Sequence, residues 1–362
     1  MNRKKIGILT FHRAHNYGAV LQCYALQEFL RSMGYDAFVI DYNNHDLWEM
    51  YDWFKLYDVC FCFQKWNKIP NRIVKLLLKW YKTIPRFYKF KRFQERQLHL
   101  APTKDIQAKP FDVILIGSDQ VWNLDITHGF DEYYWGQFTH PSKTKIATYG
   151  ASLKKYWKAE ETAEAISNIK NLYAVSTREQ ELASYLKTLD ESINPIVVSD
   201  PVFLLSKEVW SKIAKKPNIH QPYVLFYQAM DNESVYNVAV EIARKENKKL
   251  IVLSANINGR NSSISRSASP ADFIGWIKYA DLVVTSSFHA TAFSIIFQKP
   301  FYCVNLQMGH DSRLLDVLKT FDLSDRWINT AEDCNKLKIF EPQKYLMDMQ
   351  NAATNYINNI LG

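Results

Sequence analysis

The sequence predicts an α/β protein with two Rossmann-like, doubly wound domains that face a cleft. Short apolar runs rich in Val and Ile alternate with amphipathic stretches, which is the pattern of repeated βαβ units around a parallel sheet. The chain has 362 residues, of which 47% are hydrophobic, and this length suffices for about two domains with sizeable cores. Because the alternation occurs in both halves of the chain, we expect one such sheet in each half.

The first half contains six runs that we expect to form strands. Between the first two lies "YGAVLQCYALQEFLRSMGY", whose apolar residues recur at helical spacing and which contains Gly34, a residue placed to end a helix. This helix and its flanking strands form one βαβ unit. The predicted strands are Ile6–Thr10, Ala37–Asp41, Val113–Ile116, Ile146–Tyr149, Leu172–Ser176 and Ile196–Val198.

The second half repeats the scheme with four further predicted strands. The stretch "VVSDPVFLL", around Asp200 and Pro201, marks the passage between the halves, so we expect an N-terminal domain at 1–200 and a C-terminal domain at 201–342. A last helix at 343–362 is expected to pack back on the N-terminal domain. The four strands are Tyr223–Tyr227, Leu250–Leu253, Leu282–Thr285 and Phe301–Val304.

Cysteine content and the N-terminal stretch indicate a cytoplasmic protein without a metal site. The five cysteines are scattered and show no Cys-x-x-Cys spacing, so neither a disulfide framework nor a zinc site is expected. The first apolar run stops at His12, which is too short for a signal peptide or a membrane-spanning helix.

The formal net charge of +8 is concentrated in residues 48–97, which hold twelve Lys or Arg and four Asp or Glu. Aromatic residues interleave with these cations, and Ile69, Ile73, Leu76 and Trp80 recur at helical spacing. This combination is typical of an interfacial helix on an anionic membrane, so we predict a membrane-facing insertion. The alternative is that the apolar face packs on the protein while the cations are solvated.

Polar residues follow the predicted strands at the sheet edge where ligands bind in doubly wound folds. The loop "FHRAHNYGA" holds His15 and Asn16 and has no G-x-G-x-x-G fingerprint, so no dinucleotide site is expected. The loop "GSDQVWN" holds Ser118, Asp119 and Asn123, whose donors and acceptors suit recognition of sugar hydroxyls. The alternatives are a plain polar turn for the first loop and helix capping for the second.

Arg178 follows another strand, in "YAVSTREQEL". A guanidinium at a strand end can hold a carboxylate or a phosphate with a bidentate fork. The alternative is a surface ion pair with the neighbouring Glu179.

His289 lies in "LVVTSSFHATAFSIIFQKPF", where we expect a turn at 286–290 before a helix over Thr291–Phe297. An imidazole can act as an acid or base near neutral pH, and Ser286, Ser287 and Thr291 offer hydrogen bonds to an anion. The stretch lacks the G-x-S-x-G pattern of a serine nucleophile, so His289 is the expected catalytic group.

Taken together and in order, these motifs resemble the polysaccharide pyruvyltransferase family. The matching stretches are "TFHRAHNYGAVLQCYAL", "IGSDQVWN", "TYGAS", "VSTRE", "SDPVFLL" and "TSSFHATAFSIIFQKPF". The resemblance implies a fold of glycosyltransferase type B with phosphoenolpyruvate as donor. It also implies formation of a cyclic pyruvate ketal on a sugar, such as galactose, of a capsular or exopolysaccharide precursor in bacteria. The chemistry requires no cofactor.

By the resemblance, the family's histidine, taken to be the general acid, corresponds to His289. The arginine of the family's S-x-R-E-like motif corresponds to Arg178. Several members read Arg-Leu-His-Gly where this chain has Ser-Phe-His-Ala, so the arginine two residues before the histidine is missing. Arg313 is our candidate for its replacement, and the competing cations are Arg260, Arg266 and Lys299.

The implied organisation has a donor side in the C-terminal domain and an acceptor side in the N-terminal domain. Ser286, Ser287 and Arg313 would bind the donor together with Arg178, while His15, Asn16, Ser118, Asp119 and Asn123 would bind the acceptor. The expected acceptor is linked to polyprenyl pyrophosphate, and the expected location is the cytoplasmic face of the inner membrane. No nucleic-acid partner is expected.

Two other functions stay open at this point. A glycosyltransferase of the same fold would use a nucleotide sugar in place of the enolpyruvate. A non-catalytic sugar-binding protein would explain the missing arginine, and it would bind ligand without turnover.

Overall fold

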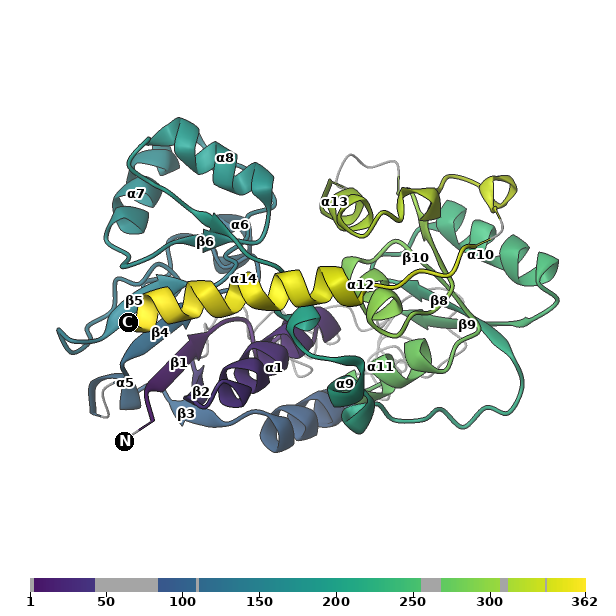
Figure 1. The fold of residues 1–362 in the computed structure, drawn as a ribbon, viewed down its shortest axis with the longest axis horizontal. Coiled ribbons are helices and arrows are strands. Elements are labelled where there is room, and N and C mark those ends of the chain that lie inside the picture. Colours follow the sequence, from purple (N-terminus) through teal and green to yellow (C-terminus); the bar gives the residue numbers. More distant parts are fainter. Residues whose placement is uncertain (1–2, 43–83, 109–110, 255–267, 307–311, 336) are drawn as a thin grey trace, which may run out of the picture. The chain divides into compact units, whose positions relative to one another are not determined.

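The computed structural model describes residues 3–42, 84–108, 111–254, 268–306, 312–335 and 337–362 (Figure 1). These residues divide into two compact units. The first unit holds 3–42, 94–108, 111–205 and 346–362, and the second holds 84–93 and the described residues of 206–345. Each is an α/β unit with a parallel sheet, so the predicted fold class is confirmed at this level.

The first unit is built on a five-stranded parallel sheet in the order β3-β2-β1-β4-β5. Its strands are β1 (Lys5–Leu9), β2 (Asp36–Asp41), β3 (Leu100–Pro102), β4 (Val113–Ile116) and β5 (Lys145–Thr148). Two short strands, β6 (Ser176–Thr177) and β7 (Ile196–Val197), pair with each other in parallel. The helices are α1 (Tyr17–Ser32), α5 (Asp105–Ala108), α6 (Leu124–Thr127), α7 (Ala159–Lys170), α8 (Gln180–Leu189), η2 (Pro201–Leu204) and α14 (Gln343–Leu361), the last belonging to this unit from Leu346.

The predicted strand Leu172–Ser176 is largely wrong, because only Ser176 belongs to the observed strand β6. The preceding residues run beside β5 but bond to it at isolated points, such as the bridge between Ala147 and Ala174. The Ser176 N–H donates to the Thr148 hydroxyl at 2.7 Å, and the Thr148 hydroxyl in turn donates to the Ser176 carbonyl at 2.9 Å. These side-chain hydrogen bonds compete with a regular ladder and keep the strand short.

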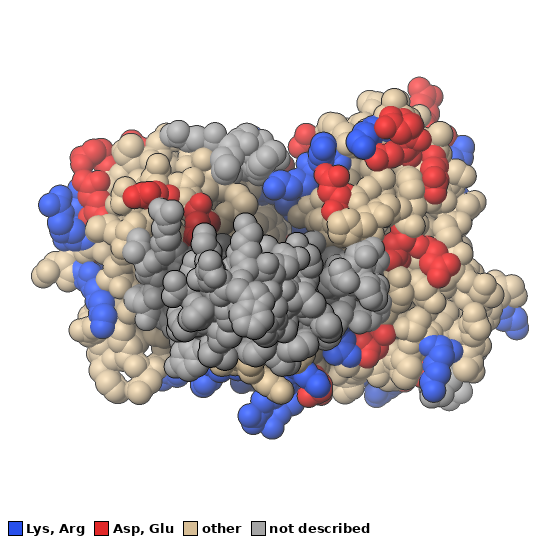
Figure 2. Space-filling model, turned by 180° about the vertical axis from the view of Figure 1, so that it is seen from behind, with Lys and Arg blue, Asp and Glu red and all other residues tan. Residues whose placement is uncertain are grey.

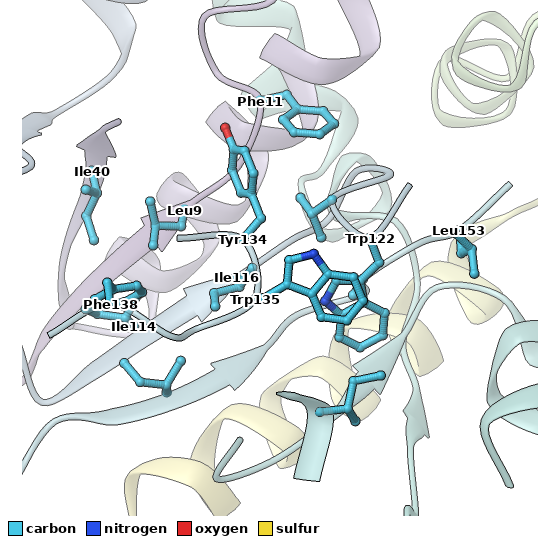
Figure 3. Packing of buried hydrophobic residues seen from close by; sticks show 14 of the residues in the cluster. Leu9, Phe11, Ile40, Ile114, Ile116, Trp122, Tyr134, Trp135, Phe138 and Leu153 are labelled. Carbon is cyan, nitrogen blue, oxygen red and sulfur yellow. The ribbon is translucent and has the colours of Figure 1, made fainter. Parts of the chain in front are cut away.

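One hydrophobic cluster of the first unit joins residues of the sheet to residues of the segments that follow β4 (Figure 3). Trp122 and Trp135 are fully buried and stacked, with ring centroids 5.7 Å apart. The Trp157 indole packs beside them and donates a hydrogen bond to the Trp122 carbonyl at 3.0 Å. These large rings hold the loops after β4 and β5 against the sheet, and so they position the groups at its carboxyl edge.

The C-terminal helix packs along β5. Within the first unit, the Tyr356 hydroxyl donates to the Thr148 carbonyl at 2.6 Å, and Lys145 Nζ donates to the Ile360 carbonyl at 2.6 Å. The Gln350 amide donates to the Leu204 carbonyl at 3.0 Å. The end of the chain therefore covers part of the sheet formed by its beginning.

The second unit has a parallel sheet in the order β12-β11-β10-β8-β9. Its strands are β8 (Tyr223–Gln228), β9 (Lys249–Ser254), β10 (Leu282–Thr285), β11 (Phe301–Val304) and β12 (Trp327–Ile328), so all four predicted strands are confirmed and a fifth is added. The helices are α9 (Lys207–Ile213), α10 (Glu233–Lys245), α11 (Pro270–Lys278), α12 (Phe288–Ile296), α13 (Ser312–Thr320), η3 (Ser324–Arg326) and η4 (Ala331–Asp333).

Most of the predicted basic insertion lies outside the described residues, and its described part, 84–97, is helical. Arg86, one of the twelve cations that we expected to face a membrane, is 3% exposed, and its guanidinium carbon lies 5.2 Å from the centre of the Phe90 ring, so this residue is not a surface cation. On the face shown in Figure 2, the described cations are interspersed with carboxylates. Within the described part of the chain, no helix is both long and apolar enough to cross a membrane.

Candidate functional site

Each unit has one point at its carboxyl edge where the chain leaves the sheet in opposite directions. In the first unit this switch point lies between β1 and β4, because the chain continues to β2 on one side and to β5 on the other. In the second unit it lies between β8 and β10. Ligands of doubly wound folds bind at such points, because the diverging loops leave a crevice there. The loops after these strands carry most of the predicted site residues.

The loop after β1 ends at Asn16, which is the N-cap of α1. The Asn16 Oδ1 accepts hydrogen bonds from the main-chain N–H groups of Gly18 at 2.9 Å and Ala19 at 3.5 Å. The oxygen is therefore engaged by the helix, while the Asn16 side-chain amide still offers donors at an exposed position. His15, next to it, is half-buried.

A partly buried ionic cluster joins the same loop to Asp41, on residues that we did not select from the sequence. The His12 ring is buried, and its Nδ1 lies 3.2 Å from the Thr10 carbonyl while its Nε2 lies 3.0 Å from Asp41 Oδ1. Arg13 completes the cluster with a fork on Asp41, at 2.8 Å from Nε to Oδ1 and 2.6 Å from Nη2 to Oδ2. Both ring nitrogens of His12 thus face oxygen atoms.

The cluster stabilises the ionised form of Asp41. Hydrogen bonds from His12 lower the pKa of Asp41 most, burial opposes this effect, and the Arg13 fork adds to the lowering, so the pKa falls well below its usual value. Asp41 ends β2, so the cluster ties the loop after β1 to the neighbouring strand. His12 and Arg13 lie in the motif "FHRAHNYGA", but their partner Asp41 is 29 and 28 residues away in the sequence, so the motif alone does not reveal the cluster.

The second loop of this switch point begins at Gly117, which has φ +126°. A Cβ atom at this position would lie 2.3 Å from the Tyr149 carbonyl oxygen, so only glycine fits here. The next residue, Ser118, is fully buried, and its side chain does not reach the surface. We expected Ser118 to contact a ligand, and the structure instead places it inside the loop.

Of the polar residues in "GSDQVWN", Asp119 is the one that we predicted and that is partly exposed. Its Oδ1 accepts from the Gln120 N–H at 2.8 Å. Asn123 is 7% exposed and caps α6, with Oδ1 accepting from the Asp125 N–H at 3.1 Å. The alternative that these groups cap a helix therefore holds for Asn123.

Arg178 connects four segments at the carboxyl edge. Its Nη1 lies 2.6 Å from Asp200 Oδ2 and donates to the Ser118 carbonyl at 3.0 Å. Its Nε contacts Glu179 Oε1 at 3.3 Å, and its Nη2 contacts the Ser152 hydroxyl at 3.3 Å. The side chain is 6% exposed, so this is a buried network and not the surface ion pair considered above.

The network keeps Arg178 charged. Burial alone lowers the pKa of Arg178, but Glu179, Asp200 and Asp119 outweigh it and raise the pKa above its usual value. Asp200 uses its other oxygen to accept from the Val202 N–H at 3.0 Å, which caps η2. Arg178 therefore orders this edge of the sheet, whatever else it contacts.

In the second unit, His289 lies in the first turn of α12. We expected a turn over 286–290, but the helix begins at Phe288, three residues earlier than predicted. The Ser287 N–H donates to the Thr285 hydroxyl at 3.0 Å. This hydrogen bond turns the chain directly after the strand, so the helix begins without a longer loop. His289 is half-buried and meets the Phe288 ring edge-on, with centroids 5.1 Å apart.

The helix entrance suits an anion, because the first turn of a helix carries main-chain N–H donors and the positive end of the helix dipole. Ser286 is partly exposed and Ser287 nearly buried at this entrance. Thr291 does not join them, because it is fully buried and its hydroxyl lies 3.1 Å from the Cys303 sulfur. Our expectation that Thr291 offers a bond to a ligand is wrong.

Arg313 and Lys299, two of the cations considered for the donor site, lie at opposite edges of the sheet. Arg313 is half-buried, lies in the first turn of α13 and follows β11, which places it on the carboxyl side of the same sheet. Lys299 precedes β11 and therefore lies at the opposite edge, where burial lowers its pKa although Asp281 opposes the shift. Arg260 and Arg266 lie outside the described residues.

The two groups of predicted residues belong to different units. His289, Ser286, Ser287 and Arg313 are in the second unit, while Arg178 and the acceptor candidates are in the first. Among the described residues, no three His, Cys, Asp or Glu side chains are grouped closely enough to hold a metal ion.

Comparison with known proteins identifies the family of the chain. Residues 16–307 match the family model of polysaccharide pyruvyl transferase, which covers most of the chain. The search of curated protein sequences gives no match. In structure, a Listeria monocytogenes protein assigned as a UDP-N-acetylglucosamine 2-epimerase is similar, with a TM-score of 0.50, 11% identity, and 97% of this chain and 91% of that chain covered. A UDP-GlcNAc 2-epimerase from Neisseria meningitidis has a TM-score of 0.46 and 12% identity, with 99% of this chain and 99% of that chain covered.

The His12 and Asp41 cluster leads to a prediction about stability. The pKa of Asp41 is lower in the folded state than in the unfolded state. Ionised Asp41 therefore stabilises the protein at pH values above the ordinary pKa of an aspartate, and this contribution is lost as the pH falls through the folded-state pKa. Asp41→Asn should therefore flatten the fall in the free energy of unfolding between about pH 5 and pH 2. Urea unfolding followed at several pH values measures this slope.

The matched control is Asp316→Asn, at an exposed aspartate on α13. It should leave the acid slope of the wild type in place. Equal slopes for the wild type and Asp41→Asn would contradict the assignment.

Proposed function

Because the chain belongs to the polysaccharide pyruvyl transferase family, we propose that it transfers the enolpyruvyl group of phosphoenolpyruvate to two hydroxyls of one sugar. The products are a cyclic pyruvate ketal and inorganic phosphate. We further propose that the sugar is a hexose such as galactose in a lipid-linked precursor of a surface polysaccharide. The observation that carries the proposal is the family match together with a histidine at the helix entrance of a switch point.

The reaction needs one proton donor and a site for anions. His289 protonates the methylene carbon of phosphoenolpyruvate, which makes the central carbon cationic so that a sugar hydroxyl can add. Phosphate then leaves this carbon, and a second hydroxyl of the same sugar takes its place and closes the ring. Of the two hydroxyl protons, one replaces the proton that His289 gave to the methyl carbon, and the other leaves with the phosphate.

The charges of the second unit suit the donor. The first turn of α12 with Ser286 and Ser287 provides N–H and hydroxyl donors for the carboxylate or phosphate, and Arg313 adds a cation on the same side of the sheet. We propose these residues as the donor site, with Arg313 replacing the arginine that other family members carry before the histidine.

The first unit suits the acceptor. We propose that Asp119 and His15 contact sugar hydroxyls, because both are partly exposed at the switch point. Asn16 offers its side-chain amide beside them, and Ser118 and Asn123 hold the loop that carries Asp119.

The first functional prediction concerns His289. His289→Gln and His289→Ala should fold normally and lower turnover by roughly 10²–10⁴, the range for a lost general acid. The measurement is phosphate release from saturating phosphoenolpyruvate with a panel of lipid-linked and aryl galactosides, glucosides and mannosides. The exposed His220, changed to Gln, is the control in the same unit.

The outcomes also separate the other functions. Near wild-type turnover in both His289 variants would contradict the acid assignment. Wild-type protein that consumes a nucleotide sugar but no phosphoenolpyruvate would be a glycosyltransferase, and saturable sugar binding without turnover would indicate a binding protein.

The second functional prediction concerns Arg178, which has a structural role whether or not it touches the donor. Arg178→Lys should raise the KM for phosphoenolpyruvate, because an ammonium cannot reproduce a bidentate fork. It should also lower the Tm, since a buried carboxylate loses its partner. Initial rates over a range of donor concentrations, with thermal unfolding of the same samples, give both values.

Asp200→Asn is the matched variant, because it weakens the same network and keeps the guanidinium. If Arg178 contacts the donor, only Arg178→Lys raises the donor KM, although both variants lose stability. Equal donor KM in the two variants would assign Arg178 to the scaffold alone.

The third functional prediction concerns the membrane. We propose that the basic segment 48–97 holds the enzyme on an anionic bilayer, where a lipid-linked acceptor is reached. Replacing Lys75, Lys79 and Lys82 by Gln should weaken salt-sensitive binding to vesicles that contain phosphatidylglycerol, while activity on a short water-soluble acceptor is kept. Because Arg86 is buried, it is left unchanged.

The charge-matched control replaces the exposed lysines Lys143, Lys187 and Lys319 by Gln. Sedimentation with vesicles at low and high salt compares the two triple variants. Equal binding of both would show that the segment has no special affinity for the bilayer.

A further inference from the structure

Tyr156 is an exposed aromatic residue that is held rigidly in the first unit. Tyr156 is 46% exposed. Its ring nevertheless stacks on the Tyr185 ring, with centroids 3.9 Å apart and an interplanar angle of 21°. Its hydroxyl donates to Glu181 Oε1 at 2.9 Å. One face of the ring is covered by Tyr185, and the orientation of the ring is set at both ends.

The stacked pair is anchored to the core. The Tyr185 ring lies 6.0 Å from the Trp157 ring, which packs in turn on Trp122 and Trp135. Figure 3 shows Trp122 and Trp135 inside this core. An exposed ring that is supported in this way loses little conformational freedom when a ligand covers it, which favours binding.

The loop that carries Tyr156 is also hydrogen-bonded to the segment that holds Asp119, one of the acceptor candidates. The loop that carries Tyr156 follows β5, and it is joined to the start of α8 at two points. Ser152 donates to Glu179 Oε1 at 2.8 Å, and Tyr156 donates to Glu181. The Ser152 N–H donates to the Asp119 carbonyl at 3.2 Å, and Tyr156 follows four residues later on the same loop.

The chemistry of this surface fits a sugar. A hexose has an apolar face of C–H groups that packs on an aromatic ring, and a rim of hydroxyls that needs donors and acceptors. Tyr156 provides the ring, and the exposed carboxylate of Glu181 provides an acceptor at its edge. Burial and the hydrogen bond to Glu181 raise the pKa of Tyr156 to about 12, so the hydroxyl keeps its proton at neutral pH.

We propose that Tyr156, supported by Tyr185 and flanked by Glu181, forms a platform on which the acceptor sugar stacks. This inference rests on the proposed function for the identity of the ligand as a sugar. It adds a binding residue outside the family motifs, because Tyr156 lies between the "TYGAS" and "VSTRE" stretches.

Tyr173 provides a matched control. It is more exposed than Tyr156, at 55%, but it lies at the amino end of β5, where the Lys145 ammonium sits 4.3 Å from its ring centre. A general effect of removing an exposed tyrosine would appear at both positions, whereas a sugar platform at the carboxyl edge would appear at Tyr156 alone.

The experiment uses the full chain and two readouts. Saturation-transfer NMR with methyl galactoside, methyl glucoside and methyl mannoside, without phosphoenolpyruvate, reports sugar binding directly. Phosphate release gives the acceptor KM and the donor KM separately. The variants are Tyr156→Ala, Tyr156→Phe, Tyr156→Trp and Tyr173→Ala, each checked for folding by circular dichroism and Tm.

Tyr156→Ala should weaken acceptor binding roughly tenfold and leave the donor KM within about twofold, as expected for the loss of one stacked ring. Tyr156→Phe and Tyr156→Trp keep the ring and should retain most of the binding. Tyr173→Ala should behave as the wild type.

Three results would overturn the platform. They are unchanged saturation transfer in Tyr156→Ala, an equal loss in Tyr173→Ala, and no transfer to any of the hexosides in the wild type. Saturation transfer that is lost in Tyr156→Ala, in a protein that releases no phosphate from phosphoenolpyruvate, would instead refute the proposed reaction and support the platform.

Discussion

The buried ion pair between Arg178 and Asp200 is the interaction on which the carboxyl edge of the first unit depends. A buried guanidinium is stable only if its donors are satisfied, and here a main-chain carbonyl, a hydroxyl and two carboxylates satisfy them. These acceptors come from the loops after β4 and β5, from the start of α8 and from the cap of η2. One side chain therefore sets the relative positions of four segments that are far apart in the sequence.

Around this pair, the polar residues divide into those that hold the loops and those that face outward. Ser118 and Asn123 are buried and support the loop, whereas Asp119 reaches the surface. The His12 and Asp41 cluster likewise holds the loop after β1 in place. A polar motif at a strand end is thus largely scaffold, and only a minority of its groups are available to a ligand.

The carboxyl edges of the two units differ in chemical character, and the difference follows the needs of the proposed substrates. The second unit offers a helix entrance, hydroxyls and a cation, which favour an anionic donor. The first unit offers a partly exposed carboxylate and a supported aromatic ring, which favour a neutral sugar. Because the arginine before His289 is missing, the proposed donor site relies on a cation from another strand end, Arg313.

The sequence alone determined the α/β class, most of the strands and the strand-end positions of His289 and Arg178, because periodicity and turn residues act over short distances. It did not determine the short strands β3 and β12, whose two or three residues form only by pairing with a neighbour. Nor could it show that Asp41 meets His12, that Arg178 meets Asp200, or that Arg86 and Thr291 are buried. Such pairings join residues distant in the sequence, and burial depends on what packs against a side chain, so only the tertiary structure decides them.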